Sequence, residues 1–398
     1  MSFDTVDLLT GKVFQVTWDL GRRCNYDCSY CPVTRHNNFS PHASLDSLKK
    51  NADFMFEYID TYMEYRTYKV AAITFTGGEP TVNPNFMEFA KWLKSEYQTK
   101  YKHKWKASFA LTSNGAMSEK IANAIALNMD HITVSYHTEA DDKLKSQAKE
   151  RIVQFNEEAE ARSNFNLSIN VMFHAERFDE CKDLCTWLDQ NNIAYVPRVI
   201  GEEADSPGSF AHKYNQEQID YMKNFWNKKN ADLNKDVEEA NQLSAVGEKT
   251  SEKKKLGMTI GRPCCGSREM CLSKGNESRK STFVDFREFK GWHCSVNWFF
   301  LHIEQETDKV FHHQTCQAKF GGERGYIGRM GRGGADLMLK KLRDQLSTGT
   351  MPTIICPKHT CGCGLCAPKS KYKDKYFETI DSHIDKRAFA NTGDADAL

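Results

Sequence analysis

The chain has 398 residues, with 40% hydrophobic and 27% charged side chains and a formal net charge of +1 at pH 7. This length allows two or three domains with a sizeable core, and the near-neutral charge gives no overall reason to expect nucleic acid or a membrane surface as a partner. The longest strongly apolar run, 296–303, is too short for a membrane span, and the N-terminal segment MSFDTVDLLTGK lacks the apolar core of a signal peptide. We therefore expect a cytoplasmic protein.

The predicted elements alternate regularly through the first half of the chain. Residues 13–20 predict a strand that runs into the loop GRRCNYDCSYC, apolar residues at helical spacing predict a helix with Ser44 as its N-cap, and 68–76 predicts a buried strand. The alternation continues with helices expected at 84–98, 117–128, 140–162 and 177–190 and with strands expected at 107–112, 131–137, 167–173 and 194–200. About six βα units predict parallel strands with right-handed crossovers. A closed eight-fold barrel usually needs about 250 residues. We therefore expect an α/β fold, an open TIM-like (β/α)6 partial barrel with its site at the carboxyl ends of the strands.

The composition changes after these units. We expect four segments: the partial barrel over 1–226, a charged and partly helical linker over 227–260, a smaller cysteine-rich domain over 261–372, and a tail over 373–398. In the cysteine-rich part, strand-like residues on both sides of the segment QETDK predict a hairpin, and His312 and His313 are interpreted as exposed histidines at a strand end.

The chain contains 14 cysteines, grouped in three regions. Without an export signal, such a number favours metal, cluster or catalytic use over disulfides. The first group, Cys24, Cys28 and Cys31, has three thiols, whereas a structural zinc site needs four ligands; His36 is a nearby candidate for a fourth. Three thiolates on a four-iron cluster leave one iron open for an exogenous ligand. The triad therefore predicts a cluster that binds a small molecule at the metal.

The spacing Cys24-xxx-Cys28-xx-Cys31, in the loop after the first strand, resembles the signature of radical S-adenosylmethionine (radical SAM) enzymes. The resemblance implies a [4Fe-4S] cluster at the triad that binds S-adenosylmethionine (AdoMet). It also implies reductive cleavage of AdoMet to a 5′-deoxyadenosyl radical, which abstracts a hydrogen atom from a substrate. By the same resemblance, Tyr30 packs near the adenine.

The segment Gly77-Gly78-Glu79-Pro80 supports the resemblance. Glycines let the backbone approach a ligand closely, and a glutamate accepts a hydrogen bond from an ammonium group. The resemblance implies that this segment holds the amino group of the cofactor. An ordinary turn at a strand end is the alternative for the segment considered alone.

Further strand-end residues give weaker signals. By resemblance, Asn114, Ser135, Asn170 and Arg198 are candidates for contacts with the cofactor; the alternative is that each caps the following helix. His137 is a candidate base or substrate contact, although a structural role is the stronger interpretation. Cys181 and Cys185, four residues apart on a helix, are predicted to pack in the core.

The C-terminal cysteines resemble the SPASM and twitch extensions of radical SAM enzymes, which hold auxiliary iron–sulfur clusters. The candidate ligands are Cys294, Cys316, Cys356, Cys361, Cys363 and Cys366. The spacing of the last four departs from the usual pattern, and Cys264, Cys265 and Cys271 are additional, so one or two clusters are possible. Four thiolates serve zinc equally well by spacing, and structural zinc remains the alternative.

The function expected from these features is radical hydrogen abstraction. Peptide modification is slightly favoured as the reaction; a small molecule, nucleoside or sugar is the alternative substrate. The expected partner is an electron donor of the flavodoxin or ferredoxin kind; no membrane partner is expected, and nucleic acid is disfavoured. Two other interpretations stay open: a radical SAM core with a zinc-stabilised C-terminal domain, and a non-catalytic zinc-binding module that contacts RNA.

Overall fold

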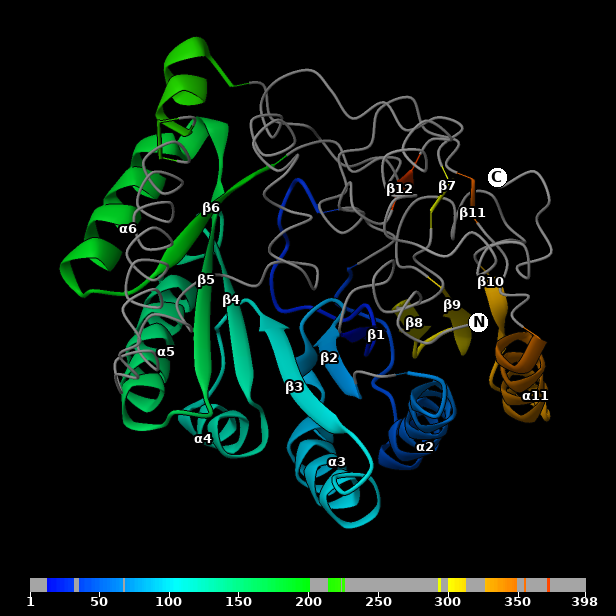
Figure 1. Cartoon of the computed structure of the whole chain (residues 1–398). Coiled ribbons are helices and arrows are strands. Elements are labelled where there is room, and N and C mark those ends of the chain that lie inside the picture. Colours follow the sequence, from blue (N-terminus) through cyan, green and yellow to red (C-terminus); the bar gives the residue numbers. More distant parts are fainter. Residues whose placement is uncertain are drawn as a thin grey trace, which may run out of the picture.

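The computed structural model describes residues 13–31, 36–66, 69–200, 214–222, 224–225, 293–294, 300–312, 326–348, 354–355 and 371–372. Strands and helices alternate through its first half (Figure 1). The strands are β1 (Phe14–Asp19), β2 (Val70–Thr76), β3 (Lys106–Ser113), β4 (His131–His137), β5 (Asn166–Phe173) and β6 (Tyr195–Val199). The helices are α2 (Leu45–Met63), α3 (Phe86–Lys100), α4 (Glu119–Asn128), α5 (Asp142–Ala161) and α6 (Phe178–Gln190). Each expected element of this region is present, with ends shifted by a few residues.

Side-chain caps set where several helices begin. The Ser44 hydroxyl accepts a hydrogen bond of 3.2 Å from the Ser47 amide, as expected for the N-cap of α2. Ser118 caps α4 and Asp141 caps α5 in the same way. These caps satisfy amides that the first turn of a helix leaves without a partner, so the sequence itself fixes where each helix leaves its loop.

The six strands are parallel and adjacent in the order β1-β2-β3-β4-β5-β6. The sheet does not close among the described residues, because β6 is an edge strand. The α/β fold with an open partial barrel is therefore confirmed.

The other edge of the sheet extends beyond β1. Strand β8 (Phe300–Glu304) pairs parallel with β1, and β9 (Lys309–Phe311) and β10 (Tyr326–Arg329) follow as antiparallel neighbours. The hairpin around 305–308 is confirmed, but it belongs to the barrel sheet rather than to a separate sheet of the cysteine-rich region. Helix α11 (Gly334–Thr348) packs beside α2 on the helical side. The proposed domain limits are otherwise untested and stay a prediction.

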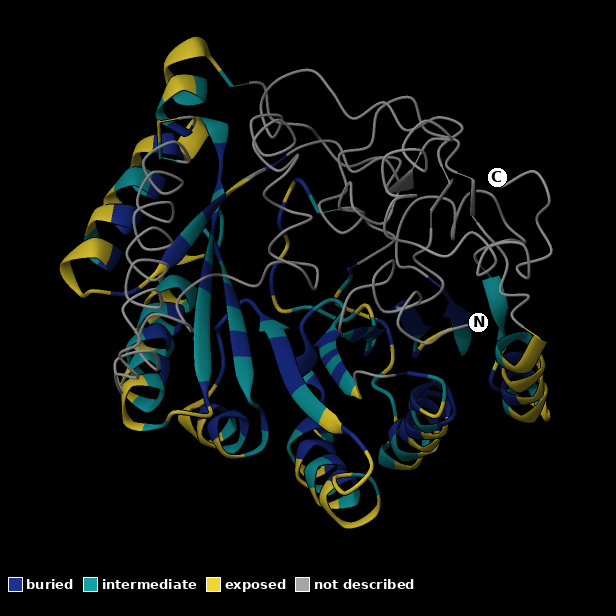
Figure 2. Cartoon of the chain, viewed as in Figure 1, coloured by how far each residue is buried: buried dark blue, intermediate teal, exposed yellow. Residues whose placement is uncertain are grey.

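The two faces of the sheet differ in chemistry, because residues at i and i+2 of a strand share a face. Phe14, Val16 and Trp18 of β1 are buried toward the helices, as are the corresponding residues of the other parallel strands (Figure 2). Cys181 and Cys185 of α6 join this apolar core, as predicted. On each parallel strand, the residues that alternate with these core-facing residues form the opposite face of the sheet. This face is largely polar, and we call it the polar face.

A small second sheet has the order β11-β7-β12, with β7 (His293–Cys294) between β11 (Ile354–Ile355) and β12 (Lys371–Tyr372). The strand pairing of β7 gives the backbone position of Cys294 in this sheet. The other candidate auxiliary ligands, Cys316, Cys356, Cys361, Cys363 and Cys366, lie outside the described residues, as do Cys264, Cys265 and Cys271. Among the helices that the structure describes, none has the length and apolarity to cross a bilayer.

Candidate active site

The loop that carries the cysteine triad follows β1 and is fastened to the end of β2 by backbone hydrogen bonds. The Leu20 amide donates to the Thr76 carbonyl, the Gly78 amide to the Gly21 carbonyl and the Glu79 amide to the Arg23 carbonyl, each at 2.8 Å. These bonds extend the pairing of two parallel strands past their ends. They hold the start of the cysteine loop at the carboxyl edge of the sheet.

The two glycines are required for this close approach. A Cβ at Gly77 would lie 2.4 Å from the Gly21 carbonyl oxygen, and the backbone of Gly77 has a φ of 133°. A Cβ at Gly78 would lie 2.4 Å from the carbonyl oxygens of Arg22 and Arg23. Because the obstacles are backbone atoms, no rotamer change makes room for a side chain. The two glycines therefore allow the end of β2 to form backbone hydrogen bonds with the cysteine loop.

Glu79 is a buried link between β2 and β3. Its carboxylate accepts hydrogen bonds from the Thr81 amide at 3.0 Å and hydroxyl at 2.6 Å, from the Ser113 hydroxyl at 2.9 Å and from the Asn114 amide at 2.6 Å. Burial raises the pKa of this carboxyl, and the same hydrogen bonds oppose the rise. The carboxylate thus has a structural role that the sequence did not indicate. Pro80 follows it as the first residue of the short helix η1 (Pro80–Val82).

Asn114 connects the end of β3 to the cysteine loop. Its side-chain amide donates to the Asn25 carbonyl oxygen at 2.7 Å and lies 4.0 Å from the Cys24 sulfur. Asn25 in turn donates to the Ala116 carbonyl at 3.2 Å. The loop is therefore held by the ends of β1, β2 and β3 together.

The three thiols lie in surroundings that suit a metal cluster. None of them forms a disulfide, Cys28 is buried, and Cys24 and Cys31 are half-buried against apolar neighbours. Burial raises the pKa of Cys24 to about 11 and also raises the pKa of Cys28. Such thiols keep their protons at neutral pH unless a metal ion displaces them. Among the described cysteines no fourth joins them, so the donor set fits a [4Fe-4S] cluster with one open iron.

Several polar residues surround this loop. His36, considered as a fourth ligand, is buried, with its Nε2 atom 3.3 Å from the Asp27 carboxylate. Tyr30 contacts the end of β4: its hydroxyl forms a hydrogen bond with His137 Nδ1, and the two rings are stacked with centroids 5.9 Å apart. Burial lowers the pKa of His137 to about 4, so this histidine is neutral at physiological pH.

A second contact fastens the far end of the cysteine loop. The Ser29 amide and hydroxyl donate to the two oxygens of Glu139 at 2.9 and 2.7 Å, and His174 lies 3.1 Å from the same carboxylate. Sequence reasoning did not single out Ser29, Glu139 or His174. Glu139 and His174 closely follow β4 and β5, so the rule that selected Asn114 would also have selected them.

Ser135, Asn170 and Arg198 come together on the polar face. Ser135 pairs with Asn170 in the register of β4 and β5, and Arg198 Nε donates to Asn170 Oδ1 at 2.9 Å. The three side chains offer a hydroxyl, an amide and a guanidinium along neighbouring strands. Contact of any of the predicted cofactor-binding residues with AdoMet stays a prediction.

Comparison with known proteins supports the assignment of this region. Residues 18–188 match the family model of the Radical SAM superfamily. GTP 3′,8-cyclase 1 from two strains of Mycobacterium tuberculosis is 26% identical over 125 residues, which are 31% of this chain and 32% of the relative. The match thus spans about a third of the length of these curated relatives.

Two solved structures show a distant likeness in fold. Native anSMEcpe with bound AdoMet and the Cp18Cys peptide has a TM-score of 0.48 and 12% identity, over 83% of this chain and 79% of that one. A maturase of the [FeFe]-hydrogenase has a TM-score of 0.34 and 13% identity, over 55% and 50% of the two chains. The match to the Radical SAM superfamily covers less than half of the chain, and it includes the cysteine triad and most of the partial barrel.

Proposed function

We propose that the chain is a radical SAM enzyme whose cysteine triad holds a [4Fe-4S] cluster and whose polar face receives AdoMet and a substrate. When bound, the cluster and AdoMet supply, with one electron from an external donor, methionine and a 5′-deoxyadenosyl radical that takes a hydrogen atom from the substrate. The observation that carries this proposal is the loop of three thiols, one buried and two half-buried, which is fastened at the carboxyl ends of the strands within a matched family segment.

The chain's own residues contribute position and shelter. The Gly77–Glu79 backbone and Asn114 fasten the loop that carries the three cysteines, and Tyr26, Tyr30 and Ile200 pack with these cysteines in a small apolar cluster. Ser135, Asn170 and Arg198 lie on the face that AdoMet would use. A hydroxyl and an amide suit the ribose, and a guanidinium suits the methionine carboxylate.

The finer assignments follow from the sequence. A peptide is the favoured substrate, with a small molecule, nucleoside or sugar as the alternative. The C-terminal cysteines hold one or two auxiliary iron–sulfur clusters, with zinc as the alternative, and a flavodoxin- or ferredoxin-like protein supplies electrons. About eight iron and eight sulfide ions per chain would support two four-iron clusters. About four irons together with zinc would support a zinc-stabilised C-terminal domain.

The proposal is tested by AdoMet cleavage under strictly anaerobic conditions. Reconstituted protein with a chemical reductant should release 5′-deoxyadenosine, measured by chromatography. Cys28→Ala should abolish this product because the cluster loses one of three ligands. Cys181→Ala is the matched control, because its thiol is packed in the core behind the sheet. Undiminished cleavage by the Cys28 variant would refute the assignment.

A further inference from the structure

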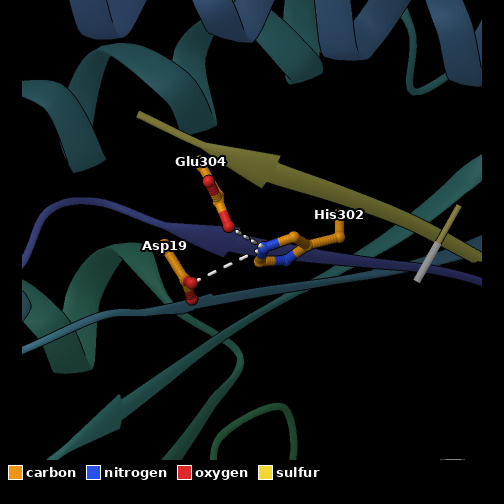
Figure 3. A group of neighbouring side chains, drawn as sticks. All are labelled: Asp19, His302 and Glu304. Carbon is orange, nitrogen blue, oxygen red and sulfur yellow. Dashed lines mark ion pairs between the residues drawn. The ribbon is translucent and has the colours of Figure 1, made fainter. Parts of the chain in front are cut away.

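Three side chains outside the proposed reaction lie together where β1 and β8 run side by side (Figure 3). Asp19 is the last residue of β1, and His302 and Glu304 belong to β8. The register sets Thr17 opposite His302 and Asp19 opposite Glu304. Paired residues of neighbouring strands share a face, as do residues two apart, so all three side chains project from the polar face. Their ligand atoms lie within 4.8 Å of one another.

His302 is unusual because it is fully buried and makes no hydrogen bond through either ring nitrogen within the described part of the chain. Its Nε2 atom lies 3.5 Å from Asp19 Oδ2 and 3.6 Å from Glu304 Oε1 (Figure 3). A charged hydrogen bond between nitrogen and oxygen spans about 2.7–2.9 Å. A single N–H would also approach one oxygen in preference to the other. The nearly equal, longer gaps therefore do not describe a hydrogen-bonded histidine.

The spacing fits three ligands around a common ion. Ligands about 2.1 Å from a tetrahedral metal are about 3.4 Å from one another, close to both gaps. Two carboxylates and a neutral imidazole carry two negative charges, which a divalent cation neutralises. One nitrogen and two oxygens suit a first-row transition metal rather than calcium or magnesium, which prefer oxygen ligands alone. Three protein ligands leave a position open for water or an oxygen donor.

Neighbouring residues orient two of the ligands. The Thr307 hydroxyl donates to Glu304 Oε2 at 2.9 Å, which leaves Oε1 directed toward His302. The Gln305 amide donates to the Asp19 carbonyl at 2.9 Å and so ties the end of β1 to the turn after β8. Arg22 forms a two-bonded ion pair with Glu306 in the turn after β8. Supporting hydrogen bonds of this kind are typical of metal sites.

We propose that Asp19, His302 and Glu304 bind a divalent first-row transition-metal ion with an open coordination position on the polar face. The site contains no thiolate, so its chemistry differs from that of the cysteine triad. Its Asp19 lies five residues before Cys24 along the chain, at the same edge of the sheet. The proposal does not depend on AdoMet chemistry.

Manganese is the suitable probe, because Mn²⁺ prefers oxygen and nitrogen ligands and leaves cysteines largely unoccupied. Titration of the full chain with Mn²⁺, followed by the loss of the free-ion electron paramagnetic resonance signal, should reveal a bound ion. Asp19→Asn and Glu304→Gln, which keep side-chain size, should each weaken its binding at least about tenfold. Asp308→Asn is the matched control, because it removes a carboxylate from the same hairpin outside the cluster.

Equal Mn²⁺ uptake by the wild type and by the Asp19 and Glu304 variants would overturn the proposal. A second readout does not need the variants to fold: bound Mn²⁺ in the wild-type chain should show nitrogen modulation from one coordinated imidazole in electron spin echo spectra. The absence of that modulation would also overturn it. A Cys24, Cys28 and Cys31 triple alanine variant should keep this site, so its result is separable from the fate of the proposed radical chemistry.

Discussion

Gly78→Ala is a sharp test of how the cysteine loop is held, because it changes no thiol and no charge. The added methyl carbon would lie 2.4 Å from the carbonyl oxygens of Arg22 and Arg23. An ordinary contact needs about 1 Å more. Only separation of the end of β2 from the loop provides that space, since both obstacles are backbone atoms.

The expected cost follows from the bonds that such a separation breaks. The Gly78 amide loses the Gly21 carbonyl and the Glu79 amide loses the Arg23 carbonyl, both now at 2.8 Å. At about 0.5–1.5 kcal/mol each, the two bonds amount to about 1–3 kcal/mol. For a domain of this size, each kcal/mol lowers the unfolding midpoint by about 2–4 °C. We therefore expect a fall of roughly 2–12 °C.

The assay is thermal unfolding of the protein without iron, followed by iron content after anaerobic reconstitution. Gly331→Ala is the matched control, because a Cβ there meets no atom within 4 Å and its backbone is not left-handed. The Gly78 variant should unfold earlier and hold less iron, because the loop that carries the three cysteines is no longer held at the end of β2. If both variants matched the wild type in midpoint and iron, the glycines would not hold the loop.

Two further predictions concern buried ionisable groups. Glu79→Gln should lower the free energy of unfolding by about 1–3 kcal/mol in chemical denaturation, because an amide cannot accept all four hydrogen bonds. The control is Glu157→Gln, since Glu157 is exposed. Equal losses of stability in the two variants would contradict the structural role of Glu79. Burial lowers the pKa of His312 to about 3, and the nearby Lys341 charge contributes. His312 therefore stays neutral in the folded chain, whereas the same histidine binds a proton in the unfolded chain below about pH 6.5. Stability should therefore fall as the pH drops from 7.5 to 5.5, and His312→Gln should remove about 1.4 kcal/mol of that fall. An unchanged pH dependence in the variant would contradict the burial of His312.

The sequence predicted the parallel strands well because their signals are local. Each βα unit carries its own apolar period and cap, as with Ser44 before α2. The interpretation of His312 as an exposed strand-end residue was wrong: it is buried. Its surroundings depend on α11, which lies far along the chain, and local periodicity does not report such packing. His313 lies outside the described residues.

Long-range pairing explains the other differences. FLHIE was expected as a strand, but its pairing with β1, nearly 300 residues earlier, is what brings Asp19 beside His302. Similarly, the hydrogen bonds from Ser113 and Asn114 to Glu79 depend on how closely β2 and β3 approach each other. The expected contact of Glu79 with the amino group of the cofactor stays a prediction. The triad itself was predictable because its three thiols lie within eight residues of sequence.

The central claim is that AdoMet reaches iron held by Cys24, Cys28 and Cys31. The most direct measurement is the electron paramagnetic resonance spectrum of the reduced, anaerobic protein before and after addition of AdoMet. A cluster signal that shifts with AdoMet in the wild type and is missing from the triple alanine variant is the predicted result. A cluster signal that does not change when AdoMet is added would contradict the account. So would a signal that shifts with AdoMet in the variant that lacks all three thiols.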